Sequence, residues 1–291
     1  MELVKIKGNT YILEGPNKVG IYLINKKEVI IIDTGQDATT GEEIMKICQD
    51  NKWQIKGIIN THSHPDHVGG NYVIHKTLKI PVYAYGLEKI LIENPFLIST
   101  IAYGGFPPKY VQNPYLMSTP TKCKDISTMD LPKGLEFFPL PGHSGDMVGF
   151  KTKDGVVFLG DALAGEKIIT KYKLWFMYDV KAYLESLDYI CDIKAEVFIP
   201  SHGEICKDIK ELVTVNREVV LEVINKIKEL CQPGLNFEGL LRELTTYYHV
   251  KLDLMQYCLI GGTLKCYLSY LLNEGLIKNE SIDNELIWVT V

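Results

Sequence analysis

Histidine and aspartate are concentrated in one short stretch of this sequence. The segment Thr61–Gly70 reads THSHPDHVGG, so four side chains that commonly bind metal ions fall within six residues. In an extended chain, residues two apart point to the same side, so His62 and His64 can bind one metal ion together. The proline that follows is favourable at the start of a helix, which directs Asp66 and His67 to a neighbouring position. Imidazoles suit zinc, iron and similar ions, and the carboxylate adds a harder oxygen ligand.

Three more residues of the same types follow apolar, strand-like segments later in the chain. His143 follows LEFFPLPG, Asp161 follows VVFLG and His202 follows EVFIPS. Loops at the ends of strands in a rigid sheet tend to converge on functional sites. Five of the seven histidines belong to this pattern, which is more than scattered structural histidines would give. We therefore predict a metal site with seven ligands: His62, His64, Asp66, His67, His143, Asp161 and His202.

The elements that would position these residues begin with alternating strands and a helix. Before residue 61, short β-like segments or apolar runs predict strands at 2–7, 10–14, 20–24, 28–33 and 55–60. The run EVIIID at 28–33 is nearly continuous, as in strands buried on both faces. An amphipathic helix is predicted from about residue 40 to 52, with Thr39 and Glu42, or Thr40 and Glu43, as a capping box.

A different texture follows at residues 86–130, which are rich in Pro, Gly and Tyr and show no sustained periodicity. A long irregular segment inside a compact domain is usually a functional lid or an interface. Tyr103 and Phe106 could supply aromatic surface to a pocket there, or simply cover the edge of the core. Regular signals return with strands at 135–140, 147–152, 156–159 and 196–200 and a helix at 180–191.

The last third of the chain is mainly helical. Apolar residues recur at helical spacing from about residue 207, and Pro233-Gly234 ends that helix. Two further helices, at 236–248 and 254–273, precede two short strands around 275–290, an order that suggests a winged-helix-like module. We predict a catalytic domain at 1–206, with an inserted lid at 86–130, and a C-terminal module at 207–291.

Composition and charge limit the class of protein. Apolar residues make up 46% of the 291 residues and the net charge is −5, which disfavours nucleic acid and anionic membranes as partners. No apolar run approaches the ~18 residues of a membrane span, and the opening segment lacks the apolar centre of a secretory signal. Seven scattered cysteines without a CxxC pair favour a reduced, cytoplasmic protein. Cys206 stands out only because it follows His202 by four residues.

The motifs THSHPDHVGG, PGHS, GD and SHG, in this order, resemble those of the metallo-β-lactamase superfamily, and the resemblance covers residues 1 to about 205. It implies an α/β fold, an αββα sandwich with the site along one edge and Asp33 beneath it. It also implies two metal positions. The resemblance assigns His62, His64 and His143 to one ion, assigns Asp66, His67 and His202 to the other, and makes Asp161 the bridge.

The resemblance further implies a hydrolase. Two divalent ions, zinc by expectation with manganese or iron as alternatives, would hold a bridging water and lower its pKa toward ~7. Asp66 would orient the resulting hydroxide and move its proton. THSHPDHVGGN is similar to glyoxalase II and its relatives, so a small-molecule ester, thioester or lactone is the expected substrate.

Two alternatives remain within the same fold. Persulfide dioxygenases use one iron, which here would be bound by His62, His143 and Asp161. Some lactamase-like proteins with a similar tail cleave RNA, but residues 216–291 contain seven Lys or Arg against ten Asp or Glu. Binding to the phosphate backbone of RNA requires an excess of positive charge. The tail is instead expected to pack against the catalytic domain or to form a homodimer contact.

Overall fold

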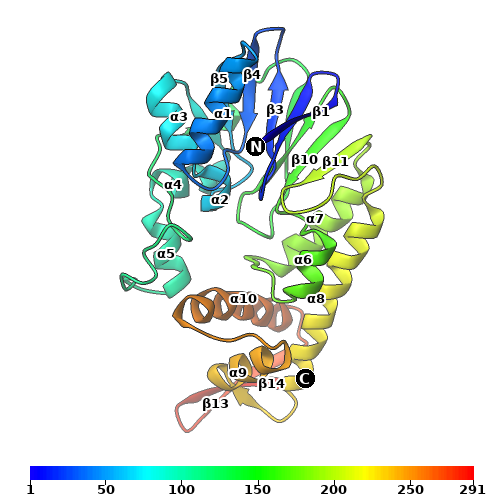
Figure 1. Ribbon diagram of the computed structural model, residues 1–291. Coiled ribbons are helices and arrows are strands. Elements are labelled where there is room, and N and C mark those ends of the chain that lie inside the picture. The colour runs from blue at the N-terminus through cyan, green and yellow to red at the C-terminus, as the bar shows by residue number, and fades with distance from the viewer.

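Two β-sheets pack face to face and carry helices on their outer sides, as Figure 1 shows for this computed structural model of residues 1–291. The first sheet has seven strands in sequential order: β1 (Glu2–Lys7), β2 (Thr10–Glu14), β3 (Val19–Leu23), β4 (Glu28–Ile32), β5 (Gln54–Ile59), β6 (Val82–Ala84) and β7 (Lys124–Asp125). The second has the order β11-β10-β9-β8, with bounds β8 (Leu135–Pro139), β9 (Val148–Thr152), β10 (Val156–Gly160) and β11 (Val197–Pro200). This confirms the αββα fold.

Helices cover the outer face of each sheet. On the first-sheet side lie α1 (Ala38–Asp50), α2 (Pro65–Val68), α3 (Asn71–Leu78), α4 (Gly86–Glu93) and α5 (Phe96–Tyr103), followed by the short 3-10 turn Ile126–Thr128. On the second-sheet side lie α6 (Glu166–Lys171), α7 (Val180–Asp192) and the long helix α8 (Lys210–Leu230). The chain ends with β12 (Leu235–Asn236), α9 (Phe237–Tyr247), α10 (Leu254–Asn273), β13 (Ile277–Ile282) and β14 (Glu285–Thr290).

Apolar side chains form one core between the two sheets and a further core between each sheet and its helices. Strand β4 is buried on both faces: Ile30 and Ile32 pack between the sheets, whereas Val29 and Ile31 face α1. This two-sided burial explains the unbroken apolar run in its sequence. The largest cluster extends from the second sheet through α7 and α8 to α9 and α10, so the C-terminal segment shares its core with the sandwich.

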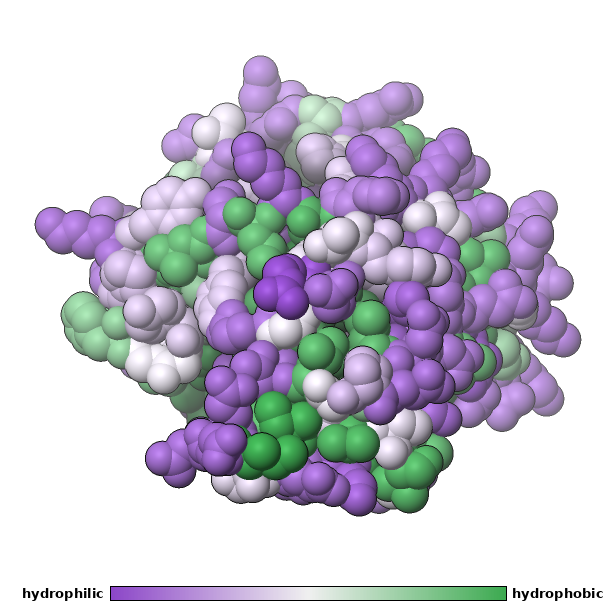
Figure 2. All heavy atoms as spheres, turned by 90° about the horizontal axis from the view of Figure 1, so that it is seen from below, coloured by the Kyte–Doolittle hydropathy of each residue, from purple (hydrophilic) through white to green (hydrophobic).

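The tail contains the helices and strands expected from its sequence. Strands β12, β14 and β13 form a small three-stranded sheet beside α9 and α10. Whether residues 207–291 are a separate winged-helix-like module stays a prediction. In Figure 2 the face of the molecule seen from below is mostly hydrophilic, with small hydrophobic patches between the polar side chains. None of the helices combines the length and the apolar character needed to cross a membrane.

Two local expectations were wrong. Helix α1 begins earlier than predicted, and its N-cap is Asp37, whose side chain accepts a hydrogen bond from the backbone N–H of Thr40. A carboxylate at this position satisfies a free N–H directly, so no capping box forms. The segment 86–130 is also less irregular than expected, since it contains α4 and α5. Each of these helices is only eight residues long, too short to show a sustained period.

Candidate metal centre

The seven expected ligands all lie on loops or helix starts beside one edge of the two sheets. His62 follows β5, and His64 is the N-cap of α2, whose first residue is Pro65. Asp66 and His67 belong to the first turn of that helix. The other three follow β8, β10 and β11, as their sequence positions suggested.

These side chains form two groups, within each of which the potential ligand atoms lie no more than 4.8 Å apart. One group contains His62, His64 and His143, and the other contains Asp66, His67, Asp161 and His202. The two groups are adjacent, because His143 Nε2 lies 3.0 Å from His64 Nδ1 in the first group and 3.6 Å from Asp161 Oδ2 in the second. The structure therefore brings together every residue of the expected set.

Asp161 lies between the two groups. Its Oδ1 is 3.4 Å from His67 Nε2, and its Oδ2 is 3.5 Å from His202 Nε2 and 3.6 Å from His143 Nε2. A carboxylate in this position is close enough to both groups to help hold an ion in each of them. This arrangement is compatible with the bridging role that the sequence resemblance implies.

Several ligand atoms are buried without any hydrogen-bond partner. His62 Nε2, His67 Nε2 and Asp161 Oδ1 are all in this state. Buried polar atoms are nearly always paired, and an unpaired one costs about 1–3 kcal/mol. Divalent cations would satisfy all three, and imidazole nitrogen with carboxylate oxygen is a donor set typical of zinc. The residues present therefore fit the metal ions that the resemblance implies.

A second layer of contacts fixes the orientation of the ligands. Asp33 has a left-handed backbone (φ 59°), and its Oδ2 lies 2.9 Å from His67 Nδ1. The same carboxylate accepts hydrogen bonds from the backbone N–H and hydroxyl of Thr61, at 2.8 and 2.7 Å. His143 Nδ1 lies 3.0 Å from the carbonyl oxygen of Phe176. These contacts occupy Nδ1 of His67 and His143, so that Nε2 of each ring faces the other candidate ligands, an arrangement found for most metal-binding histidines.

Burial and the charges in the site favour the metal-binding forms of His62, His143 and Asp161. Burial, followed by the positive charge of neighbouring histidines, lowers the pKa of His62, and burial lowers that of His143 to about 3. Burial would raise the pKa of Asp161, but the charges of His67 and His202 lower it to about 2. His67 has a raised pKa, because the carboxylates around it outweigh the effect of burial. A metal ion would replace the proton on that ring.

Two residues that support the site could not be found in the sequence alone. Asn17 donates through Nδ2 to Oδ2 of Asp66, at 2.8 Å. Glu88 of α4 is fully buried and accepts hydrogen bonds from Ser63 N (2.9 Å), Ser144 Oγ (2.5 Å) and Asp146 N (3.1 Å). Glu88 thereby joins the loop that carries His62 to the loop that carries His143. One feature of the sequence could have indicated that Glu88 is buried: it lies on the same helical face as Leu91 and Ile92.

Replacing Glu88 by alanine is expected to lower the free energy of unfolding by about 3 kcal/mol or more. The change leaves two buried donors, on Ser63 and Ser144, and one half-buried donor, on Asp146, without their acceptor, and each buried one costs about 1–3 kcal/mol. Glu88→Gln keeps the shape and one carbonyl oxygen, so its loss should be smaller. Urea unfolding of both variants measures this, with the exposed Glu42→Ala on α1 as a control that should change stability by less than about 0.5 kcal/mol. Wild-type stability in Glu88→Ala would contradict this role.

A cavity of about 500 Å³ opens directly beside the ligands. His64 and Asp66 line its inner end, and α4, α5 and α10 form much of its wall. Tyr103 and Phe106, the aromatic residues considered from the sequence, do not line it, and 81% of the Phe106 side chain is exposed. The structure thus offers one space in which a substrate could reach the seven ligands.

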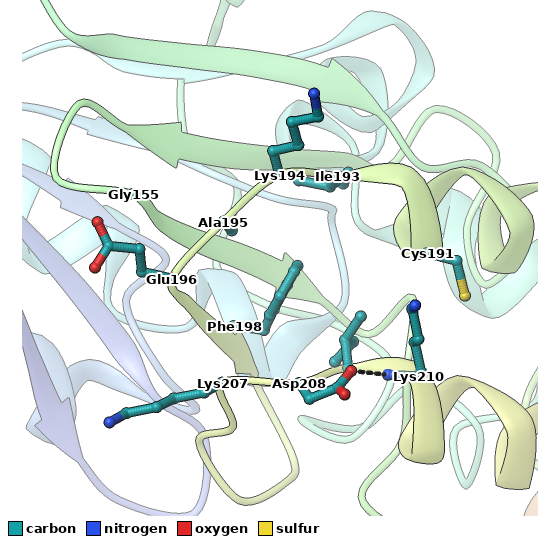
Figure 3. A pocket seen from close by; sticks show the side chains of 11 residues that line it. Gly155, Cys191, Ile193, Lys194, Ala195, Glu196, Phe198, Lys207, Asp208 and Lys210 are labelled. Atoms are coloured by element: carbon teal, nitrogen blue, oxygen red, sulfur yellow. Dashed lines mark hydrogen bonds between the residues drawn. The ribbon is translucent and has the colours of Figure 1, made fainter.

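A second hollow, of about 490 Å³, lies beside β11 and the start of α8. Figure 3 shows that its lysines, Lys194, Lys207 and Lys210, point in different directions and not toward a common centre. None of the seven ligands lines it, and neither does Cys206. The backbone of Cys206 pairs with Phe198, and burial raises the pKa of its thiol.

Comparison with known proteins identifies the family. The family described as "Metallo-beta-lactamase superfamily" matches residues 15–202, which is more than half of the chain. The chain belongs to this superfamily. The fold, the two ligand groups and the family match together support a metallohydrolase.

Similar proteins extend over different parts of the chain. A beta-lactamase-like protein 2 homolog from Drosophila melanogaster is 26% identical over 185 residues, covering 62% of this chain and 56% of its own. An atrochrysone carboxyl ACP thioesterase from Aspergillus chevalieri is 25% identical over 224 residues, covering 75% of this chain and 62% of its own. The match thus spans little more than half the length of such curated relatives.

Two solved structures resemble nearly the whole chain. A beta-lactamase domain protein from Burkholderia ambifaria superimposes with a TM-score of 0.75 at 15% identity, covering 100% of this chain and 94% of that one. A metallo-beta-lactamase family protein from Thermus thermophilus gives a TM-score of 0.67 at 19% identity, covering 99% and 97%. At these identities the likeness concerns the fold, and it includes the C-terminal segment.

Proposed function

We propose that this protein is a metal-dependent hydrolase of small-molecule esters, thioesters or lactones, with two divalent ions bound by the two ligand groups. The observation that carries the proposal is the pair of adjacent groups, with Asp161 of the second group only 3.6 Å from His143 of the first, beside a largely apolar cavity. Zinc is the expected ion, with manganese or iron as alternatives. The thioesterase among the relatives supports the choice of substrate class.

The bound ions would supply an activated water and would polarise the substrate carbonyl. Asp66 is the residue that we assign to proton transfer. Its Oδ2 is held by Asn17 at 2.8 Å and by His202 at 3.1 Å, and its side chain remains 35% exposed toward the cavity. A carboxylate fixed in this way can orient the attacking water, accept its proton and pass that proton to the leaving group.

Elemental analysis of freshly purified protein, prepared without added metal or chelator, tests this proposal. We expect close to two zinc or manganese ions per chain. Removal of the ions by a chelator should abolish ester and thioester hydrolysis, and their return should restore it. About one iron per chain and little else would overturn the proposal in favour of an oxygenase with iron on His62, His143 and Asp161, and oxygen consumption with persulfides would then be the assay.

A further inference from the structure

The cavity beside the metal ligands has two chemically different ends. Its inner end is polar and contains Ser63, His64 and Asp66. Beyond them the wall is mostly apolar, since 13 of the 21 lining residues are hydrophobic. Lys265 of α10 also lines the cavity, and its Nζ lies 5.3 Å from the centre of the Phe237 ring. A molecule that fits this space has its polar, reacting group next to the ligands and an apolar group that extends away from them.

The apolar wall comes from segments far apart in the sequence. Leu91 of α4 and Ile98 of α5 form one side, and Leu259 of α10 lies on the other. Figure 1 shows α5 and α10 facing each other below the sandwich. Ile98 and Leu259 also pack around one small core with Cys258, so the two sides hold each other in place. The C-terminal helix is therefore part of the cavity and not only a neighbour of the catalytic domain.

One position on α10 keeps this wall open. Gly262 lines the cavity, and a Cβ atom added there would meet no other atom within 4 Å. Glycine in the middle of a helix is unfavourable relative to alanine, and here the backbone does not require it, since its φ is negative. The adjacent Gly261 is buried and does not line the cavity, and a Cβ atom added to it would lie 3.7 Å from the ring of Phe237.

We propose that the acyl group of the substrate is an unbranched apolar chain, which lies between α5 and α10 with its far end beside Gly262. This inference deepens the proposed function and rests on it. In the reaction, the oxygen of water bonds to the acyl carbon and the C–O or C–S bond breaks. The acyl chain leaves as a carboxylate, and the leaving group departs as an alcohol or thiol that carries a proton. A cavity of about 500 Å³ is within the usual range for small-molecule sites.

A series of 4-nitrophenyl esters tests the length of the chain. We expect kcat/KM to rise from the acetyl through the butanoyl and octanoyl to the dodecanoyl ester, until the cavity is full. Each methylene that leaves water for an apolar wall should raise kcat/KM by about fourfold. Equal kcat/KM along the series would overturn the proposal.

Substitution of Gly262 tests the place of the chain. Gly262→Leu fills the far end of the cavity, so kcat/KM for the longest ester should fall by about tenfold or more, while that for the acetyl ester stays unchanged. Gly262→Ala should have a smaller effect in the same direction. Gly261→Ala is the matched control, because it makes the same change in helix propensity away from the cavity and should leave the whole series unchanged. An unaltered length profile in Gly262→Leu would contradict the assignment.

Calorimetric binding of dodecanoate separates this inference from the proposed function. We expect wild-type protein to bind dodecanoate at least about tenfold more tightly than Gly262→Leu does, whereas acetate should not distinguish them. If no ester or thioester is hydrolysed but dodecanoate shows this difference, the hydrolase proposal fails and the cavity assignment stands. If short esters are hydrolysed but dodecanoate binds both proteins equally, the cavity assignment fails and the hydrolase proposal stands.

Discussion

Asp66→Ala is expected to lower kcat/KM for the best ester substrate by about 10²–10⁴-fold. A positioned carboxylate that moves a proton in the transition state contributes about this much. Asp66 is suited to the role because Asn17 and His202 fix its Oδ2 while it faces the cavity. Steady-state kinetics at saturating metal concentration measure the loss, and elemental analysis of the same sample shows how much metal the variant keeps.

The control for this experiment is Asp50→Ala, which removes an exposed carboxylate at the end of α1 that belongs to neither ligand group. That variant should retain wild-type kinetics. Near-normal turnover together with near-normal metal content in Asp66→Ala would remove Asp66 from the mechanism.

Asp161→Ala is expected to abolish most of the stabilisation that zinc gives to the folded protein. A ligand present at about 100 times its Kd stabilises a protein by about 2.7 kcal/mol. Asp161 lies within 3.6 Å of side chains from both groups, so its loss should weaken the binding of both ions. The measurement is the change in Tm on adding zinc to metal-free protein, for the wild type and for the variant.

His202→Ala provides the matched comparison, because the carboxylates next to His202 belong to its own group, whereas Asp161 also lies 3.6 Å from His143 of the other group. It should keep part of the zinc-induced rise in Tm, and about one ion should remain bound. A full rise in Tm in Asp161→Ala would show that this carboxylate does not link the two positions. If the two variants lose the same part of the zinc-induced rise in Tm, the two groups do not each bind an ion of their own.

Much of the fold could be predicted because its signals are local. The apolar run of β4 and the helical spacing of α8 each lie within a single element, and their predicted ends agree with the structure to within about three residues. The residues that the structure brings together in the two groups could also be predicted, since they stand in short motifs with recognisable spacing and order. Their role as metal ligands stays a prediction.

The supporting residues could not be predicted in the same way, because their partners are distant in the sequence. Asn17 contacts Asp66 across 49 positions, and Glu88 contacts Ser144 across 56. Nothing in the local sequence of either residue indicates the partner. The predicted N-cap of α1 was wrong for a local reason. Asp37 lies just before the segment in which we expected the cap, and Thr39 and Thr40 inside that segment offered a plausible alternative.

The position of α10 has a consequence for how this protein can change over evolution. The groups assigned to bond breaking come from loops between residues 62 and 202, whereas Gly262 and Leu259 lie on a helix that contributes no ligand. Mutations on this helix can therefore alter which molecules are accepted without disturbing the reactive centre. Under the proposed role of this helix, a descendant could acquire a different preference through α10 alone and keep its catalytic residues intact, although other lining residues such as Leu91 and Ile98 belong to the same stretch as the ligand groups.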